Sequence, residues 1–119
     1  MQSLKTTVFS ALQTATALST LTGFYFQYPT SFTSLPCLSY FEVDNIGSLY
    51  ADDIEIGSEI VYQVDLWSKA SLSAYALSVD TAMTGIGFSR ILAQDLYEND
   101  THVFHKAMRY RIDVSDPTF

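Results

Sequence analysis

The chain has 119 residues, 48% of them hydrophobic, and it contains eight Phe and eight Tyr. This composition is too apolar for an intrinsically disordered protein, and the length is typical of one domain with one core. The formal net charge of −7 argues against general nucleic-acid binding, which needs clustered Lys and Arg to neutralise phosphates.

The only cysteine, Cys37, excludes an internal disulfide and a zinc site made of thiolates, and it favours a reducing compartment. It lies in an apolar run at 35–38, which is typical of a buried structural thiol. The N-terminus lacks the continuous apolar block of a signal peptide, and no apolar run approaches the roughly 20 residues of a membrane helix. We therefore expect no secretion and no membrane segment.

The first half of the chain predicts one helix and two strands. Apolar residues at spacings of three and four predict a helix over 3–20: Leu4, Val8, Ala11, Leu12, Ala15 and Leu18. Ser3 is its expected N-cap, and Gly23 its expected stop. An aromatic strand over 24–28 ends at Pro29, a polar loop covers 30–34, and alternation predicts a second strand over 36–45.

The middle of the chain predicts a long loop and then a strand. Residues 46–57 contain two glycines and an acidic run, which favours a functional or mobile hairpin loop. The segment 58–67 alternates as a half-buried strand does. Its more apolar face carries Ile60, Tyr62, Val64 and Leu66, and its other face carries Val61, Gln63, Asp65 and Trp67.

The last third predicts one helix and two strands. The helix begins at Ser68 or Ser71 and ends at Thr84, with Gly85 as the expected C-cap. Its apolar stripe is Leu72, Tyr75, Ala76, Val79 and Met83. Strands follow over 88–97 and 102–114, joined by a turn at 98–100. Phe104, Met108, Tyr110 and Ile112 share one face of the last strand, opposite His105, Arg109 and Arg111.

This order of elements predicts an α+β domain over residues 1–114, with a flexible tail at 115–119. Two amphipathic helices are expected on one face of a mainly antiparallel sheet of about four to five strands. The other face of the sheet is expected to carry mixed residues: Tyr40, Glu42, Gln63, Asp65, Trp67, Arg109 and Arg111.

No pattern in the chain predicts a catalytic residue, a metal site or a cofactor. The acidic residues Asp52, Asp53, Glu55 and Glu59 have the oxygens for calcium, but their spacing matches no EF-hand, so a solvated loop is favoured. His102 and His105 lie on opposite faces of a strand and cannot easily share a metal. Trp67 is either a core residue or an interface anchor.

Several segments together resemble the tail terminator, or tail-to-head joining, proteins of long-tailed bacteriophages. The resemblance covers nearly the whole chain, beginning with the helix of Leu4 to Leu18 and a Tyr28-Pro29 element. Its other segments are Leu35-Pro-Cys-Leu-Ser-Tyr-Phe41, Tyr62-Gln-Val-Asp-Leu-Trp-Ser-Lys69, Gly87-Phe-Ser-Arg90, Asp95-Leu-Tyr-Glu98 and Phe104-His-Lys-Ala-Met-Arg-Tyr-Arg111.

The resemblance implies a non-enzymatic ring, usually a hexamer, at the head–tail interface of a virion assembled in the host cytoplasm. Its partners would be other copies of itself, the tail tube protein and the head connector, with DNA only passing through the lumen. The acidic net charge suits such a lumen because like charges do not stick. We expect Asp52 to Glu59 to line it and to become ordered on assembly.

Two questions stay open at the level of the sequence. Arg109 and Arg111 either contact an acidic neighbouring subunit or pair within the chain with Asp65 or Glu42. The function is either that of a tail terminator, that of another head–tail connector or minor tail protein, or that of a small ligand-binding or hydrolytic domain.

Overall fold

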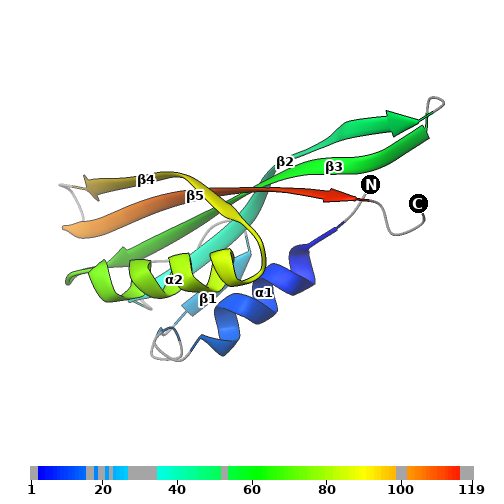
Figure 1. Ribbon diagram of the computed structural model, residues 1–119. Coiled ribbons are helices and arrows are strands. Elements are labelled where there is room, and N and C mark those ends of the chain that lie inside the picture. Colours follow the sequence, from blue (N-terminus) through cyan, green and yellow to red (C-terminus); the bar gives the residue numbers. More distant parts are fainter. Residues whose placement is uncertain are drawn as a thin grey trace.

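The computed structural model of the chain describes residues 3–15, 18, 21, 23–26, 35–51, 54–98 and 102–115. Two helices, α1 (Lys5–Thr14) and α2 (Ser73–Gly85), lie on one side of a five-stranded sheet (Figure 1). The strands are β1 (Gly23–Phe26), β2 (Cys37–Ala51), β3 (Ile54–Ser68), β4 (Ser89–Glu98) and β5 (Val103–Ser115). The predicted α+β class, with two helices on one face of a mainly antiparallel sheet, is confirmed.

The sheet has the strand order β1-β2-β3-β5-β4. Every neighbouring pair is antiparallel except β1 and β2, which are parallel. A sheet of this order has two edges, β1 on one side and β4 on the other. β1 pairs only with Cys37–Tyr40, so it covers the first quarter of the much longer β2.

The molecule is elongated because the β2–β3 hairpin projects beyond the helices (Figure 1). Its principal extents are 53 × 28 × 22 Å, and its radius of gyration of 15.6 Å exceeds the roughly 13.5 Å expected for a compact domain of this length. The predicted loop at 46–57 is therefore wrong, since β2 runs to Ala51 and β3 begins at Ile54. Two register irregularities, between Gly47 and Leu49 and between Leu49 and Tyr50, accommodate this glycine-containing segment within the ladder.

The main core lies between the helices and the sheet. The predicted apolar face of β3 is confirmed, because Ile60, Tyr62, Val64 and Leu66 are all buried there. Tyr40 belongs to the same core, and Glu42 is paired with Tyr62 in the ladder, so the expectation that both lie on the opposite face is wrong. Leu38, Tyr40 and Glu42 keep the expected alternation, but the register pairs them with the buried residues Leu66, Val64 and Tyr62 of β3, and the bulge after Glu42 moves only the residues from Asp44 onward to the other parity.

The first helix is shorter than predicted. It ends at Thr14, Ala15 is extended, and Gly23 begins β1 instead of stopping a helix. The N-cap is Leu4 rather than Ser3, and no side chain caps it. A segment rich in Ser and Thr has weak helix propensity. The helix therefore forms only over Lys5–Thr14, where burial of Val8 and Leu12 stabilises it.

The second helix ends at Gly85, one residue later than predicted, and its C-cap is Ile86 rather than Gly85. The Phe88 N–H donates to the Met83 carbonyl at 3.1 Å, and the Gly87 N–H donates to the Thr84 carbonyl at 3.1 Å. These two bonds form a Schellman motif with Gly87 at the left-handed position, where φ is +102°. Phe88 then enters the core beside Met83.

These two glycines allow a matched test of the helix end. Gly87→Ala should lower the free energy of unfolding by about 2 kcal/mol, because a Cβ is strained at this φ and would lie 3.1 Å from Ile112 Cδ1. Gly85→Ala should raise it by up to about 1 kcal/mol, since no atom lies within 4 Å of its Cβ and alanine favours helix. Urea denaturation of both variants measures this, and equal effects would contradict the assignment of Gly87.

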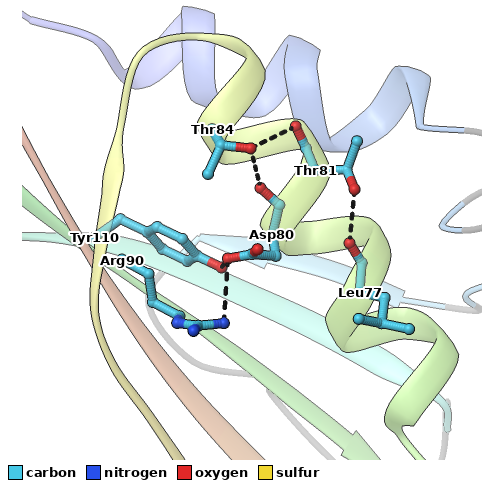
Figure 2. A network of polar contacts seen from close by, with 6 residues as sticks. All are labelled: Leu77, Asp80, Thr81, Thr84, Arg90 and Tyr110. Atoms are coloured by element: carbon cyan, nitrogen blue, oxygen red, sulfur yellow. Dashed lines mark hydrogen bonds and ion pairs between the residues drawn. The ribbon is translucent and has the colours of Figure 1, made fainter.

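A polar network fastens α2 to the two strands beneath it (Figure 2). Tyr110 Oη donates to Asp80 Oδ1 at 2.9 Å, and Arg90 Nη1 lies 3.6 Å from the same oxygen. Thr84 Oγ1 donates to the Asp80 carbonyl at 2.7 Å. Burial, and then the hydrogen bond with Asp80, raises the pKa of Tyr110 well above its usual value. Helix α2 is thereby positioned against both β4 and β5.

Candidate functional site

The face of the sheet opposite the helices carries a chain of polar contacts. Gln63 Nε2 donates to both carboxylate oxygens of Asp65 at 3.1 Å, and Arg109 Nη2 donates to Gln63 Oε1 at 2.7 Å. His105 Nε2 lies 2.9 Å from Asp65 Oδ1. An ionised carboxylate only accepts, so the histidine donates from Nε2. Asp65 is 1% exposed, which makes this network a buried one.

Trp67 extends this network into a small apolar cluster. Its ring stacks on His105 with a centroid distance of 4.5 Å, and it packs with Cys37 and Val103. Trp67 is 3% exposed, which favours core packing over an exposed interface anchor. Burial raises the pKa of the Cys37 thiol to about 11, so this thiol is protonated at neutral pH and unreactive.

The two arginines of β5 pair within the chain, although not with the expected partners. Arg109 holds Gln63, while Arg111 Nη2 donates to Asp113 Oδ2 at 3.0 Å and its Nε lies 3.6 Å from Glu59 Oε1. Neither contacts Asp65 or Glu42, because the register places Gln63 opposite Arg109 and Val61 opposite Arg111. Arg109 is half-buried, whereas the Arg111 side chain is 48% exposed. Only Arg111 is therefore well placed to meet a partner.

The predicted acidic site lies on the projecting hairpin. Asp52 and Asp53 are outside the described residues, Glu55 lies on β3 opposite Tyr50 of β2, and Glu59 lies beside Arg111. Residues 42–59 contain six acidic residues and no Lys or Arg: Glu42, Asp44, Asp52, Asp53, Glu55 and Glu59. We call this segment the acidic hairpin. Glu42 and Asp44, which the sequence did not single out as interface residues, are exposed on its outer strand.

Strand β4 is an exposed apolar edge, which sequence reasoning missed. Every residue from Ser89 to Tyr97 is exposed, and Ile91, Leu92, Leu96 and Tyr97 are among the most exposed large apolar residues. Long, exposed and apolar edge strands are typical of surfaces that meet another chain. The sequence indicated this edge only weakly. Apolar residues occur at both odd and even positions of the strand, so the pattern does not show which face is buried.

A notch interrupts this edge where β4 begins. β4 pairs with β5 only as far as Arg111, while β5 continues to Ser115, past the end of its neighbour. The resulting hollow has a volume of about 490 Å³. Its lining comprises Gly87, Ser89, Arg90, Ile91, Arg111, Ile112 and Asp113. The side chains of Arg90 and Arg111, which are 52% and 48% exposed, bring two guanidinium groups to the hollow beside the carboxylate of Asp113.

The described residues contain no group of three His, Cys, Asp or Glu side chains close enough to hold a metal ion. His102 contacts Tyr97, with Nδ1 3.1 Å from Oη, and His105 contacts Asp65. None of the helices in the described part of the chain is both long and apolar enough to cross a bilayer.

A shallow groove of about 450 Å³ runs between the two helices. Small residues of α1 and α2 line it, together with Leu77, which is 71% exposed: Ala11, Thr14, Ala15, Ser78, Thr81 and Ala82. The groove is open and has few convergent polar groups, unlike an enclosed small-molecule site. It adds a second exposed apolar surface, on the helix side of the domain.

The fold is shared with a chain in a solved structure described as the virion of a native gene transfer agent particle. The TM-score is 0.64 at 14% identity, and the alignment covers 92% of this chain and 92% of that one. No protein-family model and no curated protein matches the chain. At this identity the likeness establishes the fold, which extends over nearly the full length of both chains.

Proposed function

We propose that this chain is a structural protein of a tailed, phage-like virion and has no catalytic role. It caps the completed tail tube as a ring and joins the tail to the head connector. The observation that carries the proposal is the fold shared over 92% of both chains with a component of a virion structure. The tail-capping role rests in addition on the resemblance of the sequence to tail terminator proteins.

The surfaces of the subunit support an assembly role. It is elongated, it has one apolar edge strand, and its acidic and basic residues are unevenly distributed. A subunit with two different, complementary sides makes head-to-tail contacts, and such contacts close into a ring when the rotation between copies allows it. We propose six copies, the usual number in the family that the sequence resembles. The net charge of −7 suits a lumen through which DNA passes.

Electron microscopy of particles from producing cells that lack this chain tests the proposal. We expect filled heads beside unjoined tails, and tails of uncontrolled, excessive length, because nothing stops polymerisation of the tube. Supplying the chain from a plasmid should restore joined particles. Normal particles would overturn the proposal. Unjoined tails of uniform normal length would also overturn the terminator role, in favour of a head–tail connector.

A further inference from the structure

Exposed side chains of opposite charge lie at the same level on the two edges of the sheet. On one edge, Glu42 and Asp44 of β2 are exposed, and β1 covers β2 only as far as Tyr40 among the described strands. On the other edge lies the notch with Arg90 and Arg111. Four of the six basic residues of the chain lie on β4 and β5, together with three acidic residues, whereas the acidic hairpin has six acidic residues and no Lys or Arg.

The register of the sheet puts these charges in the same rows. One row runs Glu42, Tyr62, Tyr110, Arg90, and the adjacent row runs Asp44, Val61, Arg111, Ser89. A second copy placed beside the first in the plane of the sheet therefore brings its Glu42 and Asp44 to the level of the notch. No sliding along the strands is needed.

Shape and apolar surface match at the same place. β5 extends beyond the start of β4, so the notch is a gap in the edge where a neighbouring strand can approach. Val43, between the two acidic residues, is 36% exposed, and Ile91 in the notch is 54% exposed. Both surfaces therefore combine one exposed apolar side chain with two charged ones.

We propose that neighbouring copies of this chain join head to tail, with Glu42, Val43 and Asp44 of one copy seated in the Arg90–Arg111 notch of the next. This joint rests on the proposed ring and names its subunit interface. Arg90 and Arg111 already pair with Asp80, Asp113 and Glu59 within the chain. The incoming carboxylates therefore join existing ion pairs in networks, which set the register of the contact rather than its strength.

A charge swap between two variants tests the joint. The first variant, Glu42→Lys with Asp44→Lys, has two basic edges, and the second, Arg90→Glu with Arg111→Glu, has two acidic edges. Each alone should self-associate roughly a hundredfold more weakly than the natural chain. An equal mixture should recover multimers, because copies of the two kinds alternate around the ring. Sedimentation velocity measures this, and circular dichroism checks that each variant is folded.

Cross-linking in producing cells provides a second measurement that does not depend on reversed charges. A chain with Asp44→Cys and Ile91→Cys should give a ladder of disulfide-linked multimers after mild oxidation, at least tenfold above either single variant. Cys37 is buried and does not interfere. No ladder from the double variant would overturn the joint, and so would efficient dimers from one single variant, which indicate a symmetric contact.

The two proposals fail in different ways. A ladder from a chain that does not sediment with tails supports the joint and contradicts the tail-capping role. The chain could instead sediment with tails and be required for joining, yet give no ladder and no recovery of multimers on mixing. That result supports the tail-capping role and contradicts this joint.

Discussion

Asp65→Ala should lower the free energy of unfolding by about 3 kcal/mol, the largest effect expected of a polar substitution in this chain. Asp65 is 1% exposed and accepts hydrogen bonds from Gln63 and His105. Hydrogen bonds to a charged group contribute about 1.5–3 kcal/mol each, and removing the acceptor leaves buried donors without a partner. Relief from burying a carboxylate offsets part of this loss.

The loss of stability should include an effect on Arg109, because Gln63 also accepts a hydrogen bond from that side chain. The Arg109 Nε atom is buried and has no hydrogen-bond partner, so this side chain depends on the single bond from Nη2 to Gln63. The matched control is Asp95→Ala. Asp95 also accepts a hydrogen bond, from Lys106 at 3.1 Å on the neighbouring strand, but its side chain is 81% exposed.

Exposed ion pairs of this kind contribute at most about 1 kcal/mol. Asp65→Asn completes the series, since it keeps the volume but loses the charge and one acceptor, and it should fall between the other two. Equilibrium urea denaturation of the three variants measures the differences. If Asp65→Ala costs no more than Asp95→Ala, the network does not stabilise the sheet.

The folded protein should lose most of its stability between about pH 9 and pH 12, because several buried groups must stay protonated. Burial raises the pKa of Cys37 from 9.0 to about 11. Burial, with a smaller contribution from the Glu42 carboxylate, raises the pKa of Tyr62 from 10.0 to about 12. The pKa of Tyr110 is raised in the same direction.

The sign follows from comparing the folded and unfolded chains. Below the unfolded values of 9.0 and 10.0, both states hold the protons and the stability is unaffected. Above them the unfolded chain releases protons that the folded chain keeps, so unfolding becomes more favourable until the folded pKa values are passed. A two-unit rise corresponds to about 3 kcal/mol per group, and two such groups approach the total stability of a small domain.

Tyr62→Phe is the control for this titration. It keeps the ring, which is buried and meets Phe88 edge to face at 6.0 Å, but it removes the ionisable hydroxyl. Its stability should fall less steeply above pH 10 than that of the natural chain, by up to about 3 kcal/mol near pH 12. Denaturation at a series of pH values, with tyrosinate absorbance as a second signal, gives the comparison. Parallel curves for the two chains would contradict the buried Tyr62 hydroxyl.

Alternation of apolar and polar residues was enough to predict the centre of the sheet. On the predicted faces, Ile60, Tyr62, Val64 and Leu66 of β3 and Met108 and Tyr110 of β5 are buried, and they pack with Leu72, Ala76, Val79 and Met83 of the second helical segment. A one-residue slip would expose all of these side chains, so the pattern strongly specifies the register. Element ends were less predictable, because capping at Gly87 depends on φ and on Phe88 reaching the core.

The candidate site was only partly predictable. Glu59 lies on β3, and Arg109 and Arg111 lie on β5, in the strands that alternation predicted. The burial of Trp67 and the partial burial of Arg109 could not be predicted, because they depend on neighbours from distant segments. The positions of Glu42 and Asp44 in the ladder were not predicted, since a bulge at residue 43 has no signature in an acidic segment. Likewise, the exposure of β4 follows from its place at the end of the strand order.

The amino-acid sequence by itself determined the class of fold, the buried faces of the central strands and helices, and the excess of negative charge. These properties follow from local periodicity and composition, which act on each segment independently of the others. Only the tertiary structure decided which charges lie at the same level on the two edges of the sheet. Strand order and register are set by pairings between residues far apart in the chain, and these bring Glu42 and Arg90 into one row.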